Sequence, residues 1–261
     1  MFKKVNEFNL RVEKLIGAGL SVFIAHNWIK YLEDSLFKQF PIVEFNHNHN
    51  SFPMRPITIE KFNERGFFKD RRFSLHSSSG FNFGDSNVFG ETSRKHLLAE
   101  IELSHLCRFE RIILHSFGEW KNSRNFLKQA KEIADQKNVE LLLENNAKYE
   151  ITSPKQMMEA SEDTGLKFNL DIGHVRLFSG NDKEKCLEYI DQVKDHIAHV
   201  HVHTNNGLRD QHTQVNIDDD IAVSMIKEIN KKVKNEVWWM IEVHKHEEIE
   251  PTYNTLKKIL L

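Results

Sequence analysis

Six acidic or imidazole side chains each follow a short run of mostly apolar residues. They are His76, His115, Glu144, Asp171, His201 and Glu242. Such a run is typical of a buried strand, and the carboxyl ends of parallel strands meet on one side of a sheet. Imidazole nitrogens and carboxylate oxygens are donors that zinc, manganese and iron(II) accept. The pattern therefore predicts a divalent-metal site where the strands end.

Three further candidate donors lie just beyond two of these strands. His174 closes the segment Asp171–His174, in which Gly173 is expected to allow a tight turn that aims the imidazole. Asp210 and His212 form an Asp-x-His pair in the loop after the next strand. Nine donors exceed the four that one zinc ion usually takes. We therefore expect two or three divalent ions that share carboxylates, zinc first, with manganese or iron as alternatives.

The strands that must carry these donors alternate with helical patterns. The apolar runs are 42–45, 72–76, 111–115, 139–144, 166–171, 197–203 and 237–242, with a weaker run at 19–23. Helical periodicity appears over 28–39, 123–137, 183–195 and 221–234. Eight strand–helix units predict an α/β fold, a closed parallel (β/α)8 barrel that forms one domain over residues 1–261. The alternative is an open doubly wound sheet, which the absence of a glycine-rich phosphate motif after the first strand disfavours.

Composition excludes several classes of protein. The chain has 36 basic and 38 acidic residues, a net charge of −2, so it is not a strongly basic protein that coats nucleic acid. No run of about 18 apolar residues predicts a membrane span, and no apolar signal-peptide segment follows Met1. Two cysteines, Cys107 and Cys186, indicate a reduced, cytoplasmic protein without a thiolate metal site. The sequence predicts no oligomeric state.

The chain resembles the xylose isomerase-like TIM barrel superfamily (AP endonuclease family 2), which holds sugar isomerases and epimerases as well as endonuclease IV. The resemblance covers about residues 40–245, and its most specific motifs are 143–146, 170–174 and 199–201 with the Asp-x-His pair. It implies that all nine ligand positions of the endonuclease IV trinuclear zinc site are filled. The first ion would be held by His76, His115 and Glu144, the second by Glu144, Asp171, His201 and Glu242, and the third by His174, Asp210 and His212.

The resemblance implies two alternative activities. The first is a phosphoester hydrolase in which Glu144 bridges ions and Glu242 orients or deprotonates a water. The second is a sugar (phosphate) isomerase or epimerase, whose single ion needs mainly Glu144, Asp171, His201 and Glu242. The Asp-x-His pair favours the hydrolase. A metal-stabilised barrel without catalysis is a third interpretation.

The resemblance also bears on the substrate. Endonuclease IV enters damaged DNA with a His-Ala-Pro-Tyr segment, whereas His76 is followed here by Ser-Ser-Ser-Gly. A small anionic or phosphorylated substrate is therefore expected, with damaged DNA as the alternative.

Other polar residues are candidates for binding that substrate. His199, His201 and His203 share one face of their strand by period two. His201 is assigned as the ligand because the following Asn-Asn-Gly fits that register, so His203 lines the pocket and His199 is structural. Arg209 can hold a phosphate or be a solvated loop charge. Asn146 is the third substrate-binding candidate, and His47 and His49 are candidates for the rim of the site.

Overall fold

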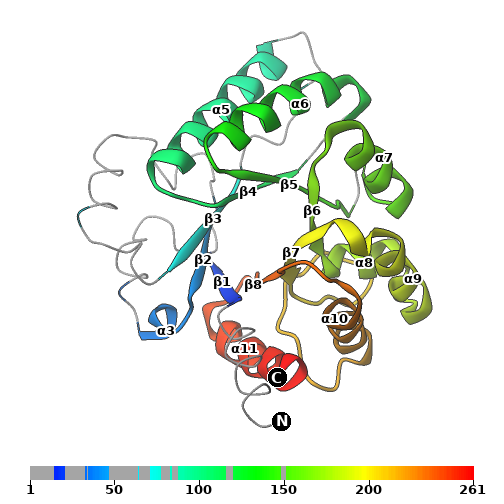
Figure 1. Cartoon of the computed structure of the whole chain (residues 1–261). Coiled ribbons are helices and arrows are strands. Elements are labelled where there is room, and N and C mark those ends of the chain that lie inside the picture. The colour runs from blue at the N-terminus through cyan, green and yellow to red at the C-terminus, as the bar shows by residue number, and fades with distance from the viewer. Residues whose placement is uncertain are drawn as a thin grey trace.

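Eight parallel strands close into a barrel in which each strand pairs with the next and β8 pairs with β1 (Figure 1). The computed structural model describes residues 15–20, 33, 35–46, 64, 71–77, 83, 88–115, 120–147 and 151–261. The strands are β1 (Ile16–Leu20), β2 (Ile42–Asn46), β3 (Arg72–His76), β4 (Arg111–His115), β5 (Glu140–Glu144), β6 (Lys167–Asp171), β7 (Ile197–Val202) and β8 (Trp238–Ile241). The predicted (β/α)8 barrel is confirmed, and the open sheet is wrong.

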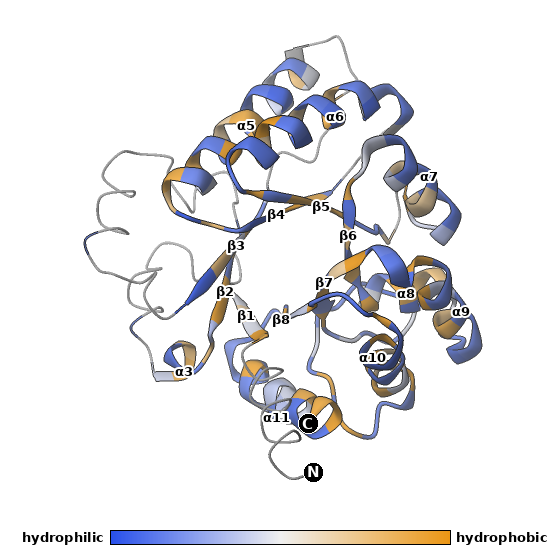
Figure 2. Ribbon diagram, in the orientation of Figure 1, coloured by the Kyte–Doolittle hydropathy of each residue, from blue (hydrophilic) through white to orange (hydrophobic). Residues whose placement is uncertain are grey.

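Helices surround the barrel and bury one side against the strands (Figures 1 and 2). They are α3 (Ser35–Lys38), α5 (Val88–Leu106), α6 (Trp120–Gln136), α7 (Pro154–Thr164), α8 (Ile172–Phe178), α9 (Lys183–Val193), α10 (Asp220–Lys232) and α11 (Ile249–Leu260), with 3-10 turns at Lys194–His196 and His246–Glu248. In α6, Leu127, Ala130 and Ala134 are buried at helical spacing. Among the described helices, none has the length and apolar character needed to span a membrane.

The inside of the barrel has an apolar layer below the polar strand ends. A small buried cluster of Ile42, Trp238 and Met240 lies inside, separate from the main core between strands and helices. Because strand side chains alternate between the two faces, Glu44 follows Ile42 on the same inner face, one step closer to the carboxyl end of β2. The apolar cluster is thus a floor beneath the polar strand ends.

Most predicted strand bounds agree with the structure, but the first does not. Strand β1 begins at Ile16 instead of at residue 19, and residues 21–23 of the predicted run lie outside the described residues. The reason is steric: a Cβ on Gly17 would lie 2.7 Å from the Ile42 carbonyl oxygen, so glycine permits the approach of β2. The close packing of β1 on β2 therefore requires glycine at position 17. Helices α6, α9 and α10 differ from their predicted ranges by up to three residues at an end, and only 35–38 of the predicted helix 28–39 is described as helix without gaps.

Candidate metal centre

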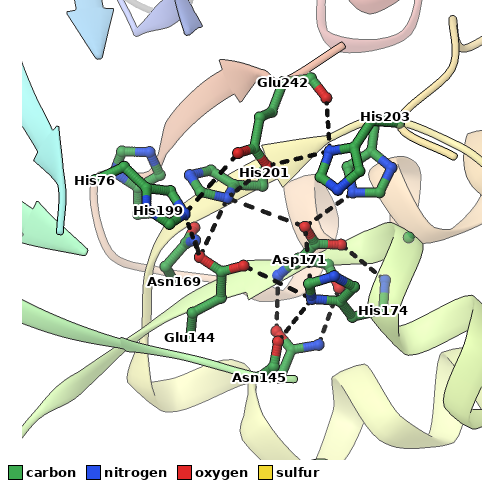
Figure 3. Close-up of polar contacts among 12 residues, drawn as sticks. His76, Glu144, Asn145, Asn169, Asp171, His174, His199, His201, His203 and Glu242 are labelled. Carbon is green, nitrogen blue, oxygen red and sulfur yellow. Dashed lines mark hydrogen bonds and ion pairs between the residues drawn. The ribbon is translucent and has the colours of Figure 1, made fainter. Parts of the chain in front are cut away.

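All six strand-end candidates lie at the carboxyl end of the barrel. Four are the last residues of their strands, His201 is one residue before the end of β7, and Glu242 directly follows β8. In the strand registers, His115 is opposite Glu144 and Asp171 is opposite His201. Figure 3 shows imidazoles from several strands arranged around Glu144, Asp171 and Glu242. The closed barrel therefore brings together side chains that are far apart in the sequence.

Two imidazoles face the buried carboxylate of Glu144. His76 Nε2 lies 3.5 Å from Glu144 Oε2, and His115 Nε2 lies 3.6 Å from Oε1. The two Nε2 atoms are 3.1 Å apart, close to the separation of about 3.4 Å that two nitrogens have on one tetrahedral zinc. Asn169 Nδ2 donates to Glu144 Oε2 at 2.8 Å and fixes the carboxylate. These three side chains lie close together, and their assignment to the first ion stays a prediction.

A second group forms around His201 Nδ1. This nitrogen lies 3.0 Å from Glu242 Oε2, 3.3 Å from Glu144 Oε2 and 4.0 Å from Asp171 Oδ2 (Figure 3). His201 Nδ1 and Glu242 Oε2 are both buried without a hydrogen bond to the described residues. One imidazole nitrogen that faces three carboxylates is the donor set predicted for the second ion.

The Asp-x-His pair joins His174 in a third group. Asp210 Oδ2 lies 3.1 Å from His174 Nε2 and 3.2 Å from His212 Nε2. A backbone pair between Thr204 and Thr213 closes the loop that holds the pair. The backbone pair therefore holds the loop in place, and from it the side chains of Asp210 and His212 point toward His174.

Main-chain carbonyls orient both imidazoles of this third group. His174 Nδ1 is 2.8 Å from the Asn145 carbonyl oxygen, and His212 Nδ1 is 3.1 Å from the Glu242 carbonyl oxygen. Because a carbonyl only accepts, each Nδ1 carries a hydrogen, so Nε2 is the nitrogen that has the lone pair when either ring is neutral. Histidines that bind metals are commonly held in this way.

His203 also lies beside this third group, but its orientation differs. Its ring stacks on His212 with centroids 3.8 Å apart and planes 15° apart. Lone pairs lie in the ring plane, so two nearly parallel stacked rings do not aim at one ion. His203 Nε2 instead contacts Asp171 Oδ2 at 2.9 Å. His203 is fully buried, and its role in substrate binding stays a prediction.

The carboxylates raise the pKa of two imidazoles in the first two groups. Burial lowers the pKa of His76, but the hydrogen bond and charge of Glu144 and the charge of Glu242 outweigh it and raise the pKa to about 9. Burial also opposes the charged form of His201, yet Glu242 and Glu144 raise its pKa well above the ordinary value. His115 differs, because burial dominates over Glu144 and lowers its pKa to about 4.

The third group shows the same effect. Burial lowers the pKa of His174, and the charge of Asp171 with the hydrogen bond to Asp210 raises it to about 10. Burial likewise lowers the pKa of His212, whereas Glu242 and Asp210 raise it to about 9. Excess negative charge thus stabilises cations at this end of the barrel.

The donor set fits divalent cations. Burial raises the pKa of Glu144, but His115 and His201 hold it well below its ordinary value, so this carboxylate is ionised. Burial also raises the pKa of Glu242 and of Asp210, but the neighbouring imidazoles outweigh it and lower both pKa values. Ionised buried carboxylates need compensating charge. Divalent ions held by these carboxylates and imidazoles would supply it.

Local structure around α8 aims two of the donors. Asp171 ends β6 and caps α8, accepting the His174 backbone N–H at 2.7 Å. Asn145 holds Asp171 through the backbone: Asn145 Nδ2 donates to its carbonyl oxygen and Asn145 Oδ1 accepts from its N–H. The predicted role of Gly173 is wrong in detail, because Gly173 lies inside α8 rather than in a turn. A Cβ there would lie 2.1 Å from His203 Cε1, so glycine leaves room for that ring.

The remaining sequence candidates differ in exposure. Asn146 is buried and its Nδ2 has no hydrogen-bond partner among the described residues, whereas Arg209 is exposed in the loop before Asp210. His47 and His49 lie outside the described residues. Sequence reasoning missed Glu44, which is buried inside β2 and contacts His201. An acidic residue within an otherwise apolar strand was the signal that could have found it.

Comparisons with known proteins agree with this fold. A family described as xylose isomerase-like TIM barrel matches residues 38–259. Two uncharacterized proteins of Methanocaldococcus jannaschii are similar over shorter stretches. MJ1614 is 34% identical over 90 residues, 33% of this chain and 33% of that protein, and MJ1311 is 30% identical over 117 residues, 41% of this chain and 39% of that protein. The chain thus aligns with well under half of either relative.

Solved structures match over nearly the whole chain. A D-tagatose 3-epimerase-like protein has a TM-score of 0.77 at 19% identity, covering 94% of this chain and 96% of its own. Endonuclease IV from Thermus thermophilus has a TM-score of 0.72 at 18% identity, covering 94% and 98%. The TTHB071 protein from the same organism, soaked with ZnCl2, has a TM-score of 0.72 at 15% identity, covering 94% and 97%. At these identities the likeness shows the fold alone.

Proposed function

Because the chain belongs to the xylose isomerase-like TIM barrel family, we propose that it is a divalent-metal-dependent phosphoester hydrolase whose metal centre resembles that of endonuclease IV. The observation that carries the proposal is the third donor group, in which Asp210 Oδ2 lies 3.1 Å from His174 Nε2 and 3.2 Å from His212 Nε2. A single-ion isomerase does not require the Asp-x-His pair, and in it His174 would bind substrate instead of metal. The proposal includes two or three ions, zinc first, with manganese or iron as alternatives.

The side chains divide the work of hydrolysis between them. Clustered divalent ions lower the pKa of water and neutralise charge on a phosphoryl group. Glu144 is almost fully buried between the first two donor groups, where its role is to bridge. The Glu242 side chain is 19% exposed, against 1% for Glu144 and 0% for Asp171. Glu242 is therefore the inner carboxylate most open to solvent, and its proposed role is to orient or deprotonate the attacking water.

The proposed substrate is small and anionic or phosphorylated, with damaged DNA as the alternative. His203 and Asn146 are the proposed donors to the substrate, and Asn146 Nδ2 has no hydrogen-bond partner among the described residues. Arg209 offers an exposed guanidinium beside Asp210. The net charge of −2 does not favour bulk DNA. We also propose a cytoplasmic location, on the basis of two free buried cysteines, Cys107 and Cys186.

Elemental analysis of protein purified without added metal tests the hydrolase. We expect two or three divalent ions per chain and hydrolysis of bis(p-nitrophenyl) phosphate. Asp210→Asn removes a charged donor of the third group and is expected to lose one ion, whereas the exposed control Asp191→Asn on α9 keeps all of them. One ion per chain in the wild-type protein contradicts the proposal.

A sugar (phosphate) isomerase or epimerase is the second candidate function. The group of Glu144, Glu242 and Asp171 around His201 Nδ1 favours it, since four such donors suffice to hold one ion next to a carbonyl. The similarity in fold to a D-tagatose 3-epimerase-like protein gives it further support. Solvent deuterium that appears in a ketose after incubation with the protein would favour this activity over hydrolysis.

A further inference from the structure

Glu44 lies inside the barrel beneath the metal centre, and both of its carboxylate oxygens have partners. It is 2% exposed. Its Oε1 lies 2.9 Å from His201 Nε2, and its Oε2 accepts a hydrogen bond from Ser74 Oγ at 2.8 Å. A buried carboxylate is costly unless its partners compensate it. The position of Glu44 is therefore fixed by an imidazole above it and a hydroxyl on the neighbouring strand β3.

The two nitrogens of His201 face opposite sides. Nε2 faces Glu44, whereas Nδ1 faces Glu242, Glu144 and Asp171 at the proposed ion position. A neutral imidazole has one N–H and one lone pair, and an ionised carboxylate only accepts. The hydrogen therefore belongs on Nε2 toward Glu44, and the lone pair belongs on Nδ1 toward the ion.

We propose that Glu44 is the positioning residue of the metal centre: it holds the tautomer and ring orientation of His201, and Ser74 holds Glu44. Metal-binding histidines commonly donate their second N–H to a carboxylate, which orients the ring and raises its basicity. In the third donor group main-chain carbonyls serve this purpose. The carboxylate of Glu44 serves it for His201, the imidazole whose other nitrogen faces three carboxylates. The inference rests on the metal centre of the proposed function and not on its reaction.

The same residues allow a different arrangement that the geometry disfavours. Glu44, His199 and His201 lie close enough to hold an ion of their own, and both nitrogens of His199 are buried without a hydrogen bond to the described residues. Such an ion would occupy His201 Nε2 while Nδ1 serves the ion above, so His201 would have to lose both of its ring hydrogens. The 2.9 Å contact to a carboxylate needs no such loss.

Metal affinity tests the role of Glu44. Zn²⁺ binding to Glu44→Gln is measured by competition with a chromophoric chelator, and the visible spectrum of the Co²⁺-loaded protein reports the ligand geometry. We expect affinity to fall about 10-fold to 100-fold and the Co²⁺ bands to change. Glu44→Ala, which lacks an acceptor oxygen, is expected to lose more. Glu140→Gln is the matched control. Glu140 is the first residue of β5, at the amino end of the strand and away from the metal centre, and it pairs with Arg111 and Lys167.

Each outcome supports or overturns the inference. An unchanged affinity and Co²⁺ spectrum in a folded Glu44→Gln protein overturn it and leave the proposed function standing. Loss of one whole ion, with the other affinities unchanged, overturns it in favour of Glu44 as a direct ligand. A wild-type protein that binds no divalent ion overturns both the inference and the proposed function. If Glu44→Gln does not fold, Ser74→Ala is used, with a weaker fall in affinity expected and an unchanged affinity contrary to the inference.

Discussion

At the scale of single residues, Glu144 is the side chain on which most of the site depends. Its two oxygens face His76, His115 and His201 from three different strands. We expect Glu144→Gln to abolish phosphodiester hydrolysis and remove at least one ion, because glutamine keeps the shape but not the charge that bridges two cations. Ion content and turnover are measured on the same preparation, with Glu140→Gln as control. Full activity in Glu144→Gln would reject the assignment.

Proton release on metal binding follows from the shifted imidazoles. His76 and His212 have a pKa of about 9 and His174 has a pKa of about 10, so all three are positively charged imidazolium groups at pH 7 in the metal-free protein. An ion needs their neutral forms, so its binding releases protons and its affinity rises with pH up to about 9–10. Titration calorimetry at pH 7 in buffers of different ionisation enthalpy measures the release. Equal heats in all buffers would contradict the expectation.

The sequence revealed donors at strand ends better than donors within strands. Residues such as His115 and Asp171 mark the point where an apolar run stops, and that junction is visible without a structure. Glu44 lies among Ile42, Val43 and Phe45, which are apolar on both faces of the strand, so alternation gives no sign of which face is inside. The partners of Glu44 come from β3 and β7, and only barrel closure brings them together.

At the scale of elements, the strands from β3 to β8 were predictable because each is a compact apolar run. Helix α8 was not, since its seven residues follow β6 without a loop and are too few to show a helical period. Its position matters, because α8 carries His174 and Gly173 over the barrel end. The fold class therefore followed from periodicity, whereas the way His174 is aimed needed the structure.

Gly173→Ala tests how closely α8 packs on the strand-end imidazoles. The added methyl would meet His203 Cε1 at 2.1 Å, so the ring must turn away from Asp171 and from its stack on His212. We expect a loss of about 1–3 kcal/mol in the free energy of unfolding, measured by denaturant titration. In a His203→Ala background the same substitution should cost much less. An equal cost in both backgrounds would show that the His203 ring is not the cause.

At the scale of the whole molecule, the barrel concentrates charge that composition conceals. The chain is nearly neutral overall, yet Glu144, Asp171 and Glu242 all lie within 4.0 Å of one imidazole nitrogen. Beneath them lies the apolar floor that contains Trp238. Composition counts residues without regard to place, so only the closed sheet shows that acids and imidazoles share one end.

This concentration of charge links metal content to the stability of the fold. The unfolded chain scatters the donors, so ions held by the proposed centre would bind the native state far more tightly and would stabilise it by mass action. Free zinc at 100 times its dissociation constant adds about 2.7 kcal/mol for one site, a rise in Tm of roughly 5–10 °C for a chain of this length. Thermal unfolding with zinc and with a chelator measures the difference. Asp210→Asn should retain part of the rise in Tm, because the donor groups around Glu144 and His201 remain. Equal Tm values for wild-type protein with and without zinc would mean that the ions do not bind the folded barrel.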